Sequence, residues 1–335
     1  MILAGIDIGT LTCRLLIADI SCNGRLTELY AERRVLTLGE GVDRHRTLDL
    51  APMARVVEAL KAWRKIIDAH HVDREIVVAT SAVRDANNRN EFLSLVEREA
   101  GFSVEVISGE EEARRTLLGI RSDLPSGTED VLALDIGGGS TECIVDRRGQ
   151  TPIACSFDIG AVRLTERFFA HDPPIPEEVE AARDLVRTSM EEVKPFLQHL
   201  DGTVCIVTAG TITTLAAMVQ RLPTFVPARI HHYRLNLHDI VRLERDLLSR
   251  TQAERRGMPG LASGREGIIV AGVIILSTAM DCLGVSNCLV SNYGLREGLL
   301  LDVAKHLRHD GPSNSTDCSA FAAPVHHVDE QSGHV

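Results

Sequence analysis

The sequence predicts an α/β fold of two related domains that flank a cleft, and three observations support this prediction. The chain has 335 residues, which is more than one hydrophobic core usually serves. Strand-like and helix-like segments alternate along most of it. A short pattern also occurs twice, at residues 6–10 and 134–138: an apolar strand, then Asp-Ile-Gly, then a loop of small residues.

The two copies of this pattern stay similar beyond the loop. In each copy a second apolar run follows, at residues 15–20 and 143–145, and then a turn that contains glycine. We therefore expect strand, phosphate-sized loop, strand, turn and strand in both halves of the chain. The shared downstream pattern favours duplication over a chance match of short strings.

Between the copies, residues 51–69 carry apolar side chains at helical spacing and predict an amphipathic helix. A buried strand at 76–79, a helix at 90–100 and a strand at 104–107 follow. Ser108 is expected to cap the next helix, whose acidic first turn suits the helix dipole. Leu124-Pro125-Ser126-Gly127 is the expected domain boundary, which gives domains of residues 1–124 and 125–294.

The second half predicts helices at 162–170, 177–194, 212–219, 265–283 and 295–307, with strands at 205–207 and 288–290. Helix 265–283 is apolar around much of its circumference, so it lies either inside the second domain or in a homodimer interface. Helix 295–307 is expected to pack on the first domain. Residues 309–335 change to a Gly, Pro, Ser, Asn and His composition that predicts a disordered tail.

The composition of the chain indicates its cellular location and the classes of partner it is not expected to bind. Hydrophobic residues make up 44% and charged residues 25%, and no apolar run has the length of a membrane helix. No signal peptide is visible, and the eight cysteines are scattered without a C-x-x-C motif, so we expect free thiols in the cytoplasm. A net charge of −11 argues against a nucleic-acid partner.

Glycine-rich loops are the first candidate binding elements. Gly137, Gly138, Gly139 and Ser140 follow a strand, where backbone amides can cradle a phosphate; the alternative is a simple strand end. Thr208-Ala209-Gly210-Thr211 precedes a helix and offers a further anion site at its N-terminus, or only a helix start. Asp7 and Asp135 end equivalent strands beside these loops. A carboxylate next to bound phosphate requires a divalent cation such as Mg²⁺, unless each Asp only binds its own loop.

The full set of motifs resembles the exopolyphosphatase/guanosine pentaphosphate phosphatase (Ppx/GppA) family. The motifs stand in the family's order over residues 2 to about 305, and the set is far more specific than any one of them. The segments that carry the resemblance are Thr80-Ser81-Ala82-Val83-Arg84, Asn88-Arg89, Val106 to Arg114, Asp135 to Glu142, Gly160 to Glu166 and Gly294 to Gly298. The resemblance implies two ribonuclease H-like domains of the actin/hexokinase/sugar-kinase superfamily.

The resemblance also implies roles for single residues. Glu112 matches the family's catalytic base, which orients a water for attack on a terminal phosphorus. Asp135 and Glu142 match the acidic pair that positions magnesium or the water, with Asp7 as a further metal ligand. Arg84 and the loop from Gly137 to Ser140 match its phosphate-binding elements. Without the family match, three consecutive glutamates in a first helical turn would be read as a solvated helix start.

Two departures from the family pattern affect this expectation. Leu11 replaces the usual Asn in the first loop, so phosphate contacts there depend on Thr10, Thr12 and backbone amides. Gly267 stands where the family carries an Asp, in a segment expected to line the cleft. Longer members also continue into a helical domain of HD type, and this chain resembles the short form, which favours shorter substrates.

These observations predict magnesium-dependent hydrolysis of terminal phosphoanhydride bonds in inorganic polyphosphate, guanosine pentaphosphate or both. A phosphotransferase of the same superfamily is one alternative, although no separate adenosine pocket or acceptor site is visible. A sensor that binds polyphosphate or the alarmone without turnover is another, which Leu11 and Gly267 favour. Neither a nucleic acid nor a membrane is an expected partner.

Overall fold

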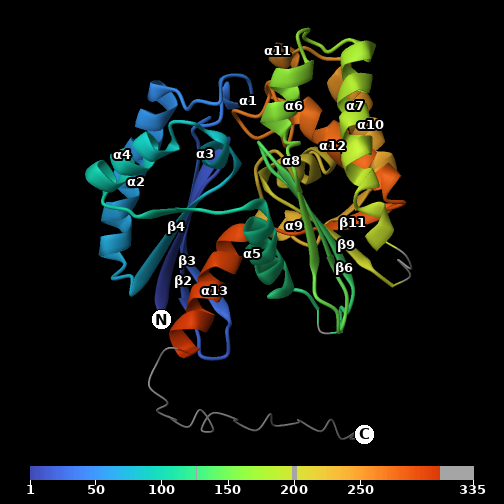
Figure 1. Ribbon diagram of the computed structural model, residues 1–335. Helices are drawn as coiled ribbons and strands as arrows, with labels where there is room; N and C mark the ends of the chain where they lie inside the picture. Colours follow the sequence, from blue (N-terminus) through green and yellow to red (C-terminus); the bar gives the residue numbers. More distant parts are fainter. Residues whose placement is uncertain (126, 198–201, 310–335) are drawn as a thin grey trace, which may run out of the picture.

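The computed structural model describes residues 1–125, 127–197 and 202–309, so all but the first residue of the predicted tail lies outside the described residues. Its strands form two sheets, one from each half of the chain, and helices pack on both (Figure 1). The predicted α/β fold class is confirmed. No helix in the described ranges combines the length and the apolar character needed to cross a membrane.

The first sheet has five strands in the order β3-β2-β1-β4-β5. They are β1 (Ile2–Ile8), β2 (Thr12–Ile20), β3 (Leu26–Val35), β4 (Arg74–Ala79) and β5 (Val104–Val106). β1 is the central strand and pairs antiparallel with β2 and parallel with β4. Its residues from Leu3 to Ile8 are buried, as expected for a strand that is covered on both faces.

The second sheet has six strands in the order β10-β11-β9-β6-β7-β8. They are β6 (Val131–Ile136), β7 (Thr141–Asp146), β8 (Ile153–Phe157), β9 (Val204–Thr208), β10 (Arg234–Asn236) and β11 (Asn287–Val290). The order β8-β7-β6-β9-β11 repeats that of the first sheet, and β10 is an addition. The pattern of strand, loop, strand, turn and strand is thus confirmed in both halves.

Helices of the first half cover one face of the first sheet (Figure 1). They are α1 (Val42–His45), α2 (Leu50–Ala69), α3 (Ser81–Asp85) and α4 (Arg89–Ala100). The core beneath them contains Trp63, Phe92 and Phe102, each almost completely buried. The predicted helices at 51–69 and 90–100 are both confirmed to within one residue.

The second half contains most of the remaining helices. They are α6 (Ala161–Phe168), α7 (Pro176–Glu191), α8 (Gly210–Val219), α9 (Pro227–Ile230), α10 (Leu237–Leu248), α11 (Gln252–Arg255) and α12 (Ile269–Cys282), with a 3₁₀ turn at Lys194–Phe196. α12 packs among α6, α7 and α10, which accounts for its apolar circumference within one chain. The homodimer stays a prediction.

Two of these helices differ from the predicted limits by three residues or more. α12 begins at Ile269 and not at 265, because Gly264 has a φ of +81° and residues 265–268 form turns. α7 ends at Glu191 and not at 194, because Pro195 lacks the amide hydrogen that a continuing helix needs.

Two helices cross between the halves. α5 (Gly109–Arg121) follows β5 of the first sheet but packs on β6, β7 and β8 of the second, whereas α13 (Leu295–His309) follows β11 and packs on β1, β2 and β4. They lie side by side near the centre of the molecule (Figure 1). A Cβ on Gly298 would lie 1.7 Å from the Arg115 carbonyl oxygen, so glycine is needed for this close crossing. The crossing positions each half against the other.

Candidate active site

The hairpin loops of the two halves face each other across a cavity of about 60 Å³. The β1–β2 loop, α5, the β6–β7 loop and the start of α8 form most of its lining, and Thr80, Arg265 and Leu295 complete it. Of the predicted site residues, the lining includes Asp7, Thr10, Thr12, Glu112, Asp135, Gly137, Gly138, Gly139, Ser140, Gly210 and Thr211. The fold therefore brings these residues together, while Glu142 and Arg84 lie just behind the lining.

Asp135 and Glu142 stand directly opposite each other on β6 and β7. The Thr116 hydroxyl of α5 donates a hydrogen bond to Asp135 (3.3 Å), and the Ser156 hydroxyl of β8 donates one to Glu142 (2.9 Å). Burial raises the pKa of Asp135 to about 6 and that of Glu142 to about 8, and the charge of Asp135 adds to the shift at Glu142. Two adjacent carboxyl groups that resist ionisation are a place where a cation would be stabilising.

Glu112 lies in the first turn of α5 and is only 8% exposed. Its neighbour Glu110 is exposed, so a solvated helix start describes Glu110 but not Glu112. Burial raises the pKa of Glu112 well above its ordinary value, the negative charge of Glu142 raises it further, and the Arg84 guanidinium 3.3 Å away opposes both. A buried carboxyl group of this kind is suited to accept a proton from water near neutral pH.

Asp7 has a different neighbour from Asp135. Directly opposite it on β2 stands Arg14, whose Nη1 lies 3.9 Å from Asp7 Oδ2. Burial raises the pKa of Asp7, whereas Arg14 and Arg296 lower it. The first half thus places a cation where the second half places a second acid.

The two glycine-containing loops are in direct contact with each other. Gly9 donates a backbone hydrogen bond to Thr12 (3.2 Å), and Gly137 donates the same bond to Ser140 (3.0 Å), so both loops have the same turn. A Cβ on Gly139 would lie 2.4 Å from Ser81 Oγ, in the other half. The close approach of the two halves therefore requires glycine at position 139. The alternative that this loop is a simple strand end does not account for that contact. The role of this loop as a phosphate cradle stays a prediction.

α8 begins at Gly210, with its N-terminus at the cavity. A Cβ on Gly210 would lie 2.3 Å from Arg265 Nη2 and 2.9 Å from Arg14 Nη2. Arg265 is 4% exposed and donates a hydrogen bond to Thr12 Oγ1 (3.4 Å). Burial, together with the charges of Arg14 and Arg33, lowers the pKa of Arg265 to about 9. Two arginines, one of them almost fully buried, therefore point at this helix start.

Sequence reasoning missed Arg14 and Arg265 as site residues. Arg14 follows Asp7 by the same interval as Glu142 follows Asp135, so an alignment of the two copies would have shown it. Arg265 lies two residues before Gly267, the position in this segment where the sequence differs from the family pattern. Both arginines supply the local positive charge that an anion site requires in a chain with a net charge of −11.

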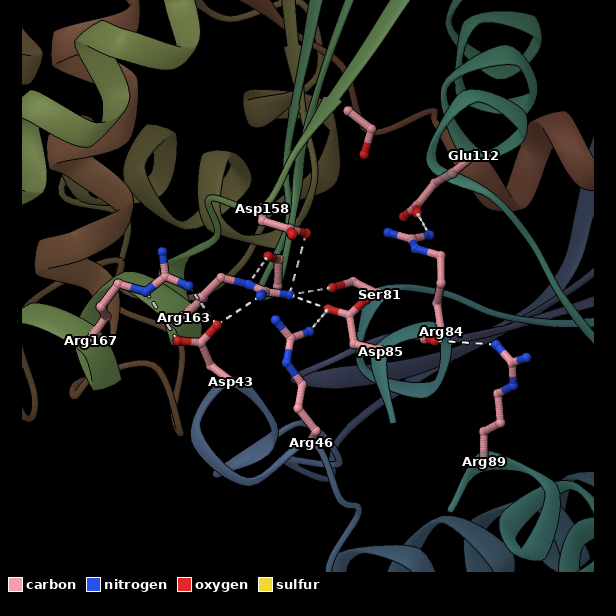
Figure 2. A network of polar contacts seen from close by, with 12 residues as sticks. Asp43, Arg46, Ser81, Arg84, Asp85, Arg89, Glu112, Asp158, Arg163 and Arg167 are labelled. Carbon is pink, nitrogen blue, oxygen red and sulfur yellow. Dashed lines mark hydrogen bonds and ion pairs between the residues drawn. The ribbon is translucent and has the colours of Figure 1, made fainter. Parts of the chain in front are cut away.

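A third missed residue, Arg163 of α6, connects the halves beside the cavity (Figure 2). It donates to the Gly139 carbonyl (2.8 Å) and to Asp43 Oδ1 (2.8 Å), and it also pairs with Asp85. The sequence had shown Arg163 only as part of a family signature. Because Asp43 and Asp85 belong to the first half, Arg163 ties the second glycine loop to the elements that carry Arg84.

The predicted phosphate ligand Arg84 is not among the residues that line the cavity. Its guanidinium donates to the Ile107 carbonyl (3.0 Å) and lies against Glu112, at the edge of a neighbouring open groove. Of the two family departures, Leu11 does line the cavity. The prediction that Gly267 lines the cleft was wrong: it is absent from the described lining, and a Cβ there would face the Gln252 side chain at 3.5 Å. The turn at 265–268 points it away.

The predicted metal ligands Asp7, Asp135 and Glu142 do not form a closed cage. In the described part of the chain, three ligand atoms come within 4.8 Å of one another at a different place, at Asp123, His231 and His232. Mg²⁺ usually takes one or two carboxylates together with waters and substrate phosphates. The opposed, buried pair of Asp135 and Glu142 fits that donor set, whereas Asp7 already faces Arg14.

Comparison with known proteins identifies close relatives. Residues 16–307 match the model of the Ppx/GppA phosphatase family. Exopolyphosphatase 2 of Mycobacterium tuberculosis is 33% identical over 90% of this chain and 98% of its own length. The crystal structure of the Aquifex aeolicus Ppx/GppA family member covers 93% of this chain and 99% of its own at 31% identity (TM-score 0.76). An exopolyphosphatase from Cytophaga hutchinsonii covers 91% and 98% at 31% identity (TM-score 0.80).

Proposed function

Because the chain belongs to the Ppx/GppA phosphatase family and is a phosphoanhydride hydrolase, we propose that it releases terminal phosphate from inorganic polyphosphate with the help of Mg²⁺. The relative from M. tuberculosis and the structure from C. hutchinsonii are both named exopolyphosphatases. The observation that carries the proposal is Glu112, a buried carboxyl group that lines the same cavity as both hairpin loops. Guanosine pentaphosphate is a second proposed substrate, since the same attack on a terminal phosphorus applies.

In this proposal Glu112 accepts a proton from the attacking water, and its raised pKa makes it basic enough to do so near neutral pH. Arg14 and Arg265 offset the negative charge of the bound phosphates, and the N-terminus of α8 adds the partial charge of its free amides. Thr10, Thr12 and the loop from Gly137 to Ser140 hold the terminal phosphoryl group. Positioning and electrostatic stabilisation are the main contributions a protein makes to phosphoryl transfer.

Magnesium enters the proposal through Asp135 and Glu142. Burial raises the pKa of both carboxyl groups, and the charge of Asp135 raises that of Glu142 further; a divalent ion would relieve that cost. When bound, Mg²⁺ supplies positive charge to the phosphate oxygens. Asp7 is a less direct candidate, because Arg14 already compensates its charge. A cytoplasmic location and a homodimer remain predictions.

Phosphate release from polyphosphate and from guanosine pentaphosphate tests this proposal, with Mg²⁺ or with EDTA. We expect Glu112→Gln to lower kcat by roughly 10²–10⁴-fold, the usual contribution of a general base, with little change in KM. Glu110→Gln is the matched control, since this exposed neighbour in the same helical turn should keep full activity. Slow release that Glu112→Gln leaves unchanged would favour the sensor, and ATP formation from ADP would favour the phosphotransferase.

A further inference from the structure

A second cavity, of about 400 Å³, adjoins the first and shares Arg14, Ala209 and Gly210 with it. It lies between β2 and β3 of the first half and the segments around Phe225 and residues 292–297 of the second. The first cavity has space for little more than one phosphoryl group and its water. The larger cavity meets the first one at Arg14 and Gly210, which line both cavities.

A pair of arginines on neighbouring strands marks the side of this cavity formed by the first sheet. Arg14 on β2 and Arg33 on β3 stand directly opposite each other, an arrangement of like charges that costs stability. Burial lowers the pKa of Arg33, and the positive charges of Arg14 and Arg296 lower it further. Charge repulsion without a compensating acid indicates a site built for an anion.

The acidic residues of the same cavity are committed elsewhere or exposed. Glu32 accepts hydrogen bonds from Arg34 (2.6 Å) and from the Trp63 indole (2.8 Å), on the other side of β3. Glu297 accepts one from the Gly294 amide at the start of α13 (2.8 Å) and forms an ion pair with Arg296 of the same cavity (3.2 Å). Among the described acids that line the cavity, only Glu28 has no hydrogen bond or ion pair of this kind, and its side chain is exposed.

A separate groove beside Arg84 differs from this cavity in its charges. It measures about 580 Å³ and contains Arg84 and Arg167, but four acids also line it: Asp85, Glu110, Asp158 and Glu192. Arg84 and Arg167 are themselves paired, with Glu112 and Asp43 respectively. Asp85 and Asp158 pair with Arg163, so among the described residues Glu110 and Glu192 are the acids of this groove that lack an ion pair. These two acids would repel a polyanion there, whereas Arg33 would attract it.

We propose that the cavity beside Arg33 receives the part of the phosphate chain that lies behind the reacting terminus, with Arg14 and Arg33 as its contacts. This inference rests on the proposed function and specifies its substrate as a linear chain that extends past Arg14. A nucleoside is less well suited to the same space. Arg33 lies over the Phe225 ring (5.2 Å to its centre), and Tyr293 stacks on His231 (5.4 Å between ring centres), so both rings already have a partner.

The test compares Arg33→Gln with the wild-type protein on tripolyphosphate and on a series of longer polyphosphates. We expect KM to rise roughly three- to tenfold for the longest chains, as the loss of one exposed charged contact implies, and to change progressively less as the chain shortens. kcat should stay constant, because Arg33 does not line the cavity that contains Glu112. Arg25→Gln removes the same charge from the exposed β2–β3 turn and should alter neither constant.

A KM that is unchanged at every length, or that rises equally for the shortest and longest chains, would overturn the inference. A change for guanosine pentaphosphate alone would assign the cavity to the nucleoside instead. Calorimetric binding of long polyphosphate to Glu112→Gln and to Glu112→Gln/Arg33→Gln gives the same comparison without turnover. It therefore still tests the cavity if hydrolysis itself fails. Arg33→Gln should keep or raise the thermal midpoint, because it removes the repulsion from Arg14.

Discussion

The two halves of the molecule carry different charges at equivalent positions of the same scaffold. In the first sheet, a row across three neighbouring strands reads Asp7, Arg14 and Arg33; in the second, the corresponding row reads Asp135, Glu142 and Ser156. Both sheets share their strand order, and both loops share the same backbone turn. The difference between the rows therefore lies in the side chains, and it divides the work of one site between a cationic half and an acidic half.

This division has an energetic consequence for folding. Arg14 faces Arg33, and Asp135 faces Glu142, so each row places like charges opposite each other where a stable sheet would avoid them. Local arrangements that oppose folding are expected at functional sites, where a ligand later offsets their cost. We expect the cationic half to govern binding and the acidic half to govern the reaction, and the following predictions test that assignment.

The largest expected effect belongs to the acidic half. Glu142→Gln should lower kcat about 100-fold or more with little change in KM, because it removes charge stabilisation of several kcal/mol around the proposed metal. It should also move the acidic limb of the pH profile to lower pH, because Glu142 raises the pKa of Glu112. Steady-state kinetics across pH measures both effects. Ser156→Ala is the control, since it removes only a hydrogen bond to Glu142; a rise in KM at constant kcat would contradict the assignment.

A smaller effect is expected in the cationic half. Arg14→Gln should raise KM for polyphosphate about 10- to 100-fold, because a hydrogen bond between charged groups contributes about 1.5–3 kcal/mol. kcat should fall much less than in Glu142→Gln. Kinetics with tripolyphosphate and longer chains measures this, with Arg25→Gln as the control for net charge. If Arg14→Gln lowered kcat and left KM unchanged, the two halves would not divide binding from reaction.

The smallest effect concerns stability and pH. The pKa values of Asp135 and Glu142, about 6 and about 8, lie above their ordinary values of 3.8 and 4.5. The folded state therefore holds protons that the unfolded state releases, so stability is complete below the ordinary values and is lost as pH rises towards 8. In EDTA we expect the free energy of unfolding to fall by roughly 1–2 kcal/mol between pH 6 and 7.

Urea unfolding at both pH values, with EDTA or Mg²⁺, measures this dependence. Mg²⁺ should flatten it by binding the ionised carboxylates of the folded state. Glu142→Gln should flatten it as well, without any metal. A protein that became more stable between pH 6 and 7 in EDTA would show that these carboxyl groups are not held in their protonated form.

Local patterns in the sequence were sufficient for most of the scaffold. The helices at 51–69 and 90–100 followed from apolar spacing, and the Ser108 cap is confirmed by the hydrogen bond it accepts from the Glu111 amide (3.2 Å). The repeat of Asp-Ile-Gly predicted that two similar units exist. Such features depend on residues close together in the chain, so a single sequence contains them.

The composition of the site depended on contacts that no local pattern records. Arg265 contacts Thr12, Arg163 contacts Asp43, and the rings and charges around Arg33 come from three segments outside its own strand. Segment 265–268 became a turn, which moved Gly267 away from the cavity and left Arg265 inside it. Sequence alone determined the duplicated scaffold, its glycine loops and its acids, because these follow from short-range periodicity. Only the tertiary structure decided which arginines meet those acids, because burial and charge pairing are set by how the two halves close on each other.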